Sequence, residues 1–178
     1  MTTTDTPQVT REQEREAIAS VPTGLFIGGE WRTTRATMPV DDPSTGEHLA
    51  EVADADPDEA AAALDAAVAA QAEWAQVPPR ERSEILTRAR DLMLADVDRL
   101  ALIMTLEMGK PLAEAKGEVA YAAEFFRWFA EEAVRIHGRY AVAPSGGTRL
   151  MTMKQPVGPV FAAVSYTHLR AHETPEHL

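Results

Sequence analysis

The sequence has 178 residues, of which 45% are hydrophobic, and its 28 acidic and 17 basic residues give a net charge of −11. So acidic a chain has no general attraction for phosphate backbones, and it contains no apolar run of the roughly 20 residues that span a membrane, so neither nucleic acid nor a membrane is an expected partner. It contains no cysteine, which excludes disulfides, thiolate metal sites and a cysteine nucleophile within these residues, and the cytosol is the expected compartment.

The beginning of the chain predicts a mobile lead. Residues 1–22 are rich in Thr, Glu and Arg and carry only scattered apolar side chains. Arg11–Ser20 has the composition for one or two helical turns, but it offers little apolar surface to bury. The acidic residues Glu12, Glu14 and Glu16 argue against a targeting peptide, because transit peptides are poor in acidic residues.

Turn residues mark the next segment. Leu25–Arg32 has the form of a β-hairpin with the glycine pair at 28–29 as its turn, and Trp31 is expected to anchor this small sheet. The alternative for the glycines, a phosphate-cradling loop, requires a helix directly after them, which the following residues do not indicate. A Pro/Gly turn over 42–46 then precedes an alternating pattern that predicts a strand over 47–52.

Three helices are predicted in the middle of the chain. The first begins at Asp56 with a capping box completed by Glu59, and it stops before the prolines at 78–79. The second begins near Arg80 and the third is capped by Asp96, each with one apolar face. The methionines of these helices are interpreted as core filling rather than as a binding surface.

The stretch Glu107–Gly138 carries the strongest helical pattern. Gly109 ends one helix, and Pro111 opens another that is predicted to reach Gly138. Aromatic residues recur along this second helix at i, i+4 and i+8, namely Tyr121, Phe125 and Phe129. The pattern predicts a helix whose broad apolar face packs against a large surface.

A loop and two strands are predicted after this helix. Residues 144–147 form the loop, and its Ser145 does not fit the Gly-x-Ser-x-Gly turn of hydrolases. Alternation over 149–155 predicts an exposed strand. The continuous apolar run Val160–Val164 predicts a strand buried on both faces, as in a parallel sheet.

The segment Ser165–Leu178 breaks these patterns and contains three of the five histidines. They are His168, His172 and His177. The run between the last two is one residue too long for the His-Glu-x-x-His zinc motif, and Pro175 would break the helix that the motif needs, so no metal site is expected. The segment is interpreted as a non-native tail, similar to translated read-through into a sequencing adaptor at the end of a truncated gene.

Five motifs in chain order resemble the aldehyde dehydrogenase superfamily, most closely its NAD(P)-dependent members that act on succinate semialdehyde. They are Leu25–Trp31, Asp42–Gly46, Trp74 with Pro79–Arg82, Glu107–Pro111 and Lys154–Val160. The resemblance implies a truncated α/β fold of aldehyde dehydrogenase type: an N-terminal β-hairpin region, a helical bundle, and the start of a strand arm and parallel sheet. Residues 1–22 are then a flexible lead, 23–164 a partial N-terminal region of the cofactor domain, and 165–178 the tail.

The resemblance also implies a mechanism for the whole enzyme. In the family a cysteine thiolate attacks the aldehyde, an Asn side chain and a backbone N–H hold the oxyanion, hydride passes to NAD or NADP, and a Glu-activated water hydrolyses the thioester. This chain departs at Ser165–Arg170, where His168 stands in place of that Asn, and it has no cysteine. No catalytic or cofactor-binding residue is carried over, so the chain alone is expected to be inactive and to bind neither NAD nor NADP well.

The nearest feature to a site is the face of the aromatic helix. The resemblance places this helix near the mouth of the aldehyde tunnel, which makes Tyr121 and Phe125 the candidate lining of a substrate channel. The alternative is that both are core aromatics. Arg127 either steers an anionic substrate or pairs with Glu124 and Glu131, which lie three positions before it and four after it.

Partners follow from the same resemblance. It implies a small-molecule aldehyde as substrate and a homo-oligomer for the whole protein. The chain alone is expected to aggregate, because Val160–Val164 and the aromatic helix face have lost their packing partners. The alternative hypothesis is a non-catalytic helical interaction module, which would unfold cooperatively and expose no apolar surface.

Overall fold

The computed structural model describes residues 9–162. In chain order the elements are α1 (Arg11–Ala19), β1 (Leu25–Ile27), β2 (Glu30–Arg32), β3 (Ala36–Asp41), β4 (His48–Asp54), α2 (Pro57–Trp74), α3 (Pro79–Ala95), α4 (Val97–Met108), α5 (Leu112–Ala133), β5 (Arg139–Val142) and β6 (Arg149–Thr152). The tail 165–178 and its three histidines lie outside the described residues, so the predictions made for them stay predictions.

The strands form three separate antiparallel hairpins. In the first, Leu25 pairs with Arg32 across a turn in which Gly28 and Gly29 have φ of 64° and 87°. Two successive positive φ angles are what a two-residue hairpin turn requires, so the predicted hairpin is confirmed. The ring of Trp31 lies 5.0 Å from that of Phe26 on this hairpin.

The second hairpin contains one strand that the sequence predicts and one that it does not. The predicted strand over 47–52 corresponds to β4, which pairs with β3. Pro39 lies within β3 opposite Glu51 and has no backbone N–H to donate. The sequence does not predict this strand, because a proline argues against a strand assignment. β3 is stabilised by its partner rather than by its own sequence pattern.

The helix starts agree with the predicted positions, with one difference in capping. At α2 the Asp56 carboxylate accepts from the Glu59 N–H at 2.9 Å, and the Glu59 carboxylate accepts from the Asp56 N–H at 2.9 Å, which confirms the capping box. Asp96 precedes α4 as predicted, but its side chain makes no capping bond. Its carboxylate instead accepts a hydrogen bond of 2.9 Å from Nε of Arg99.

The α4–α5 junction follows the predicted glycine, but α5 is shorter than predicted. Gly109 closes α4 in the left-handed region at φ 68° and ψ 17°, and Pro111 is the N-cap of α5 rather than its first residue. α5 ends at Ala133 instead of Gly138. Gly138 instead leads into the third hairpin, where an added Cβ would lie 1.9 Å from the carbonyl oxygen of Thr152.

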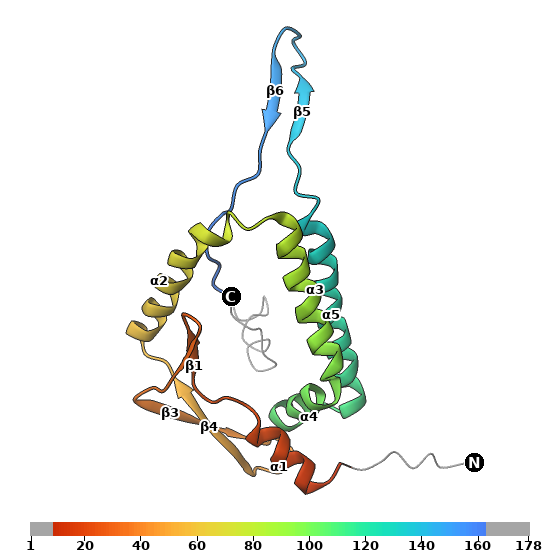
Figure 1. Ribbon diagram of the computed structural model, residues 1–178. Coiled ribbons are helices and arrows are strands. Elements are labelled where there is room, and N and C mark those ends of the chain that lie inside the picture. Colours follow the sequence, from red (N-terminus) through yellow and green to blue (C-terminus); the bar gives the residue numbers. More distant parts are fainter. Residues whose placement is uncertain (1–8, 163–178) are drawn as a thin grey trace, which may run out of the picture.

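The helical core is built around α4 and α5. α3 and α5 lie side by side, and α4 crosses beneath them (Figure 1). Ala101, Ala115 and Val119 form one buried cluster between α4 and α5. Ion pairs between Lys110 and Glu118 and between Lys116 and Asp98 brace the same junction.

A second buried cluster joins α1 to α4, which differs from the mobile lead that the composition predicts. Ala17 of α1 packs with Leu102 and Leu106 of α4. The ends of α1 are also held, by Arg11 bonding Glu47 at 2.6 Å and by Arg99 donating to the Ser20 hydroxyl at 2.9 Å. The apolar surface that the helix lacks in its own sequence is supplied by α4.

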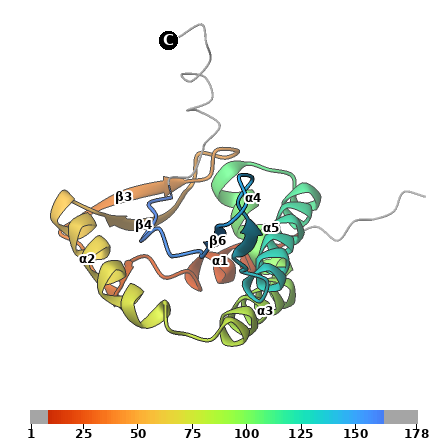
Figure 2. The same ribbon diagram turned by 90° about the horizontal axis from the view of Figure 1, so that it is seen from above.

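The third hairpin, β5–β6, projects away from the rest of the molecule (Figure 1). The predicted exposed strand over 149–155 corresponds to β6, and its partner β5 was not predicted. The chain then returns between α2 and the α3–α5 pair, as both views show (Figure 1, Figure 2).

The strand predicted over Val160–Val164 is wrong for its described part, because residues 160–162 belong to no strand. A strand exists only when its backbone pairs with a neighbour, and each strand within residues 9–162 pairs only with its own hairpin partner.

Candidate functional site

Helix α5 has two apolar faces, and the buried one is not the aromatic one. Against α3 and α4 it presents small residues that are almost fully buried, namely Ala115, Val119, Ala123 and Ala130. The aromatic residues point elsewhere: Tyr121 is 64% exposed, Phe125 49% and Phe129 56%. This exposure agrees with the expectation that the aromatic helix face has lost its packing partners in this chain. Small side chains let neighbouring helix backbones approach closely, whereas rings would hold them apart.

The exposed residues Tyr121, Phe125, Trp128 and Phe129 form what we call the aromatic face. The rings of Tyr121 and Phe125 meet edge to face, with centroids 5.0 Å apart and planes at 82°. Such a pair contributes roughly 0.5–1.5 kcal/mol beyond its buried area, so the two rings hold each other in place. The sequence prediction overlooked Trp128, although its spacing of three from Phe125 and seven from Tyr121 places it on the same face.

Chemically, the aromatic face is an apolar wall with one phenol group. It contains no thiol, imidazole or carboxylate in a position to act as nucleophile or base. Such a wall can orient an apolar substrate chain and exclude water, but it cannot carry out a bond-breaking step.

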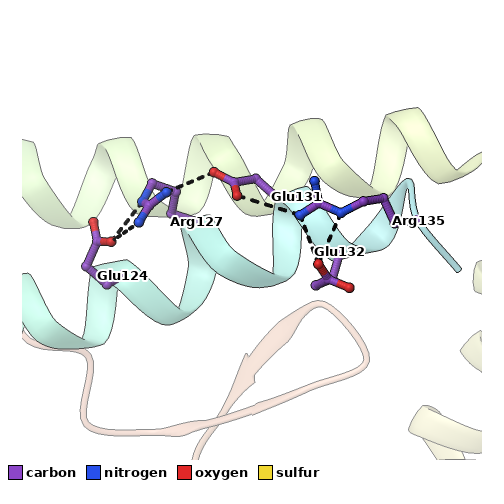
Figure 3. A network of polar contacts seen from close by, with 5 residues as sticks. All are labelled: Glu124, Arg127, Glu131, Glu132 and Arg135. Atoms are coloured by element: carbon purple, nitrogen blue, oxygen red, sulfur yellow. Dashed lines mark hydrogen bonds and ion pairs between the residues drawn. The ribbon is translucent and has the colours of Figure 1, made fainter.

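A series of ion pairs, which we call the α5 ladder, joins Glu124, Arg127, Glu131 and Glu132 of α5 and Arg135 just beyond its end (Figure 3). The helical spacing of these residues places the ladder beside the aromatic face. Arg127 bonds Glu124 through Nε at 2.8 Å and Glu131 through Nη1 at 2.9 Å. Arg135 bonds Glu132 at 2.8 Å and approaches Glu131 at 3.7 Å. Of the two alternatives that the sequence leaves open for Arg127, the structure contains the pairs with Glu124 and Glu131.

The ladder affects the ionisation of its members. The hydrogen bond from Arg127 lowers the pKa of Glu124 below its ordinary value, and the Glu124 carboxylate raises the pKa of Arg127. Both groups are therefore charged at neutral pH. Two arginines against three glutamates leave one net negative charge on this flank.

The described residues do not fit a dinucleotide cofactor. Gly28–Gly29 joins β1 to β2, and Gly146–Gly147 lies between β5 and β6, so both glycine pairs are hairpin turns. A pyrophosphate cradle needs a glycine turn that leads into the N-terminus of a helix, where backbone N–H groups face the phosphates. Residues 9–162 contain no such glycine turn between a strand and a helix.

Two further properties concern the described residues as a whole. Within residues 9–162 no three His, Asp or Glu side chains are gathered closely enough to hold a metal ion. No helix in that range is both long and apolar enough to cross a bilayer. A hollow of about 900 Å³ lies between α2 and the returning segment 154–160, with Trp74, Arg82 and Val157 among its lining residues.

The comparison with known proteins identifies the class of protein. Residues 31–168 match the aldehyde dehydrogenase family. Because the match takes in well over half of the chain, this chain belongs to the aldehyde dehydrogenase family. The match confirms the resemblance predicted from the motifs.

Individual relatives are more specific. The succinate-semialdehyde dehydrogenase of Paenarthrobacter nicotinovorans is 58% identical over 111 residues, which are 62% of this chain and 25% of that protein. The mitochondrial succinate-semialdehyde dehydrogenase of Homo sapiens is 44% identical over 140 residues, 79% of this chain and 26% of that protein. The chain thus spans about a quarter of the length of the curated relatives it matches.

Solved structures agree with these relatives. An aldehyde dehydrogenase from Brucella melitensis biovar abortus 2308 matches with a TM-score of 0.73 at 42% identity, over 76% of this chain and 28% of that chain. The succinate-semialdehyde dehydrogenase from Burkholderia pseudomallei matches with a TM-score of 0.64 at 52% identity, over 66% of this chain and 25% of that chain. They confirm the predicted aldehyde dehydrogenase-like α/β fold and do not favour a separate helical interaction module.

Proposed function

We propose that this chain is the N-terminal part of an aldehyde dehydrogenase that oxidises succinate semialdehyde to succinate with NAD or NADP. The observation that carries the proposal is the identity of 44–58% to proteins named succinate-semialdehyde dehydrogenase in bacteria and mammals. Both coenzymes occur in the names of related proteins, with NADP in a probable succinate-semialdehyde dehydrogenase of Sinorhizobium fredii and NAD in a complex of an indole-3-acetaldehyde dehydrogenase from P. syringae.

In this proposal α5 contributes one wall of the path along which the aldehyde reaches the reacting centre. Tyr121 and Phe125 are its lining residues, supported by their exposure and by the edge-to-face contact that fixes both rings. An apolar wall suits the methylene carbons of the substrate and keeps water away from them. The charged end of the substrate is held by residues outside the aromatic face, because Arg127 already bonds two glutamates.

The chain alone is proposed to be inactive. It contains no cysteine, and a thiolate is the nucleophile that the family resemblance implies. The test measures NADH or NADPH formation by absorbance at a wavelength where only the reduced coenzymes absorb, with succinate semialdehyde as substrate. We expect no rise with the purified 178-residue chain and a steady rise with the polypeptide read in frame from the native gene locus.

Two results would contradict this proposal separately. A sustained rise with the 178-residue chain would show that its inactivity was wrongly inferred. No rise with the extended polypeptide, tested with each coenzyme, would remove succinate semialdehyde oxidation as the function.

We further propose that the chain alone associates through exposed apolar surface, whereas the whole protein forms a defined homo-oligomer. Among the described residues no large side chain is completely buried, and Phe26, Trp128 and Phe161 are each more than half exposed. Sedimentation with a dye that fluoresces on apolar surface tests this, with the extended polypeptide as control. Weak dye binding and a monomeric chain would contradict it. The cytosol stays a prediction, since the relatives include proteins named as mitochondrial.

A further inference from the structure

We infer that Arg127 is a positioning residue that sets the preference for anionic substrates at the aromatic face. It does so by holding two glutamate carboxylates in ion pairs on the flank of that face, rather than by binding the substrate itself. The inference rests on the proposed function, because it concerns a substrate that passes Tyr121 and Phe125.

The geometry assigns Arg127 to the glutamates. Nε donates to Glu124 at 2.8 Å and Nη1 donates to Glu131 at 2.9 Å, while Nη2 also bonds Glu124. All three guanidinium nitrogens are thereby engaged within α5. The Nε–Nη2 edge, one of the two edges that can grip a carboxylate through two hydrogen bonds, is occupied by Glu124, and Glu131 competes for Nη1.

The position of these pairs beside the aromatic face gives them their effect. Glu124 lies three residues after Tyr121 and directly before Phe125, so its carboxylate is a neighbour of the proposed substrate wall. The low pKa of Glu124 keeps this carboxylate charged at neutral pH. With Arg127 the flank carries one net negative charge, from two arginines and three glutamates, and without it the flank would carry two.

An anionic aldehyde would meet this added charge, and a neutral aldehyde would not. For one extra charge, Coulomb's law gives an affinity weaker by about twofold at roughly 10 Å with a water-like dielectric constant and by about 100-fold at roughly 6 Å with a surface-like one. Because salt screens exposed charges, we expect the lower part of this range, about three- to tenfold. The effect should shrink at high salt, since charges at such separations are screened.

The experiment uses the polypeptide read in frame from the native locus and measures kcat and KM separately. The substrates are succinate semialdehyde, which is an anion, and butanal, which is a neutral aldehyde with the same number of carbons. Arg127→Gln should raise the KM for succinate semialdehyde about three- to tenfold and that for butanal less than about twofold. Arg127→Lys, and the double variant Arg127→Gln with Glu124→Gln, should both return the KM for the anion towards the wild-type value.

Arg15→Gln is the matched control, because it removes the same charge from the exposed surface of α1. It should change neither KM. Equal changes for both substrates, no change for either, or an anion-specific effect in Arg15→Gln as well would overturn the inference. A wild-type enzyme that oxidises butanal but not succinate semialdehyde would instead refute the proposed substrate, and with it the inference. If Arg127→Lys restored the KM for succinate semialdehyde but the double variant did not, Arg127 would contact the substrate itself. That result would also overturn the inference.

Discussion

Replacing Gly109 with alanine tests how the α4–α5 junction is held against the turn at residues 42–46. Gly109 adopts φ 68° at the end of α4, and its Cα faces that turn closely. An added Cβ would lie 3.3 Å from Cγ of Pro43 and 3.3 Å from Oγ of Ser44. Alanine therefore meets two separate costs here, one from its backbone conformation and one from its neighbours.

The two costs can be estimated separately. Placing alanine in the left-handed region costs about 1 kcal/mol relative to glycine. The two tight contacts require Pro43 or Ser44 to shift, which we estimate at a further 0.5–1 kcal/mol, roughly the lower range of overpacking costs. The sum of about 1.5–2 kcal/mol corresponds to a fall in Tm of roughly 3–8 °C for a chain of this size.

Gly46→Ala is the control that separates the two costs. Gly46 has φ 74°, similar to Gly109, but no heavy atom lies within 4 Å of its added Cβ. Urea unfolding followed by far-ultraviolet circular dichroism should show a loss of about 1 kcal/mol for Gly46→Ala and a larger loss for Gly109→Ala. Equal losses of unfolding free energy in the two variants would refute the close contact of Gly109 with Pro43 and Ser44. No loss for Gly109→Ala would also refute the cost assigned to its left-handed backbone conformation.

Four further substitutions test other parts of the structure by the same unfolding measurement. Gly117→Ala, with no neighbour within 4 Å of its added Cβ inside α5, should raise the free energy of unfolding by about 0.5–1 kcal/mol; a loss would contradict the open surroundings. Ala115→Leu, at a fully buried position, should lower the free energy of unfolding by about 1–3 kcal/mol. Phe129→Leu on the aromatic face should change the free energy of unfolding by less than about 0.5 kcal/mol. Similar losses for the two variants would contradict the assignment of one buried and one exposed face to α5. The Ser44 N–H donates to the Asp42 carboxylate at 2.7 Å and lowers the pKa of Asp42. The carboxylate therefore stabilises the fold at pH values above its unfolded pKa of about 4. This stabilisation is lost as the pH falls through the folded pKa. Asp42→Asn should therefore weaken the fall in stability between neutral and acidic pH, and an unchanged pH profile would speak against this.

Features that depend on a few neighbouring residues could be predicted from the sequence. The capping box of Asp56 and Glu59, the Gly28–Gly29 turn and the left-handed Gly109 are each decided by local chemistry, and the structure contains all three. The pairs of Arg127 belong to the same group, because helical spacing brings charges three and four residues apart together.

Features that depend on distant partners could not be predicted. α5 is apolar on two faces, so its periodicity does not say which face α3 and α4 cover; the structure places Ala123 inside and Phe125 outside. The docking of α1 depends on Leu102 and Leu106, far along the chain, and β3 depends on pairing with β4. The exposure of the aromatic face agrees with the loss of partners expected from the sequence, whereas the face of small residues that α5 buries was not predicted, because burial depends on the partner surface.

The contact of α1 with α4 has a practical consequence for recombinant expression. The family match begins at residue 31, so a start site chosen from it would remove α1 altogether. Leu102 and Leu106 would then lose Ala17 and face solvent, and Glu47 would lose Arg11. A product truncated in this way would be more prone to aggregate than the parent chain, because it would expose apolar surface of α4. The start should precede Thr10, whose hydroxyl caps the helix.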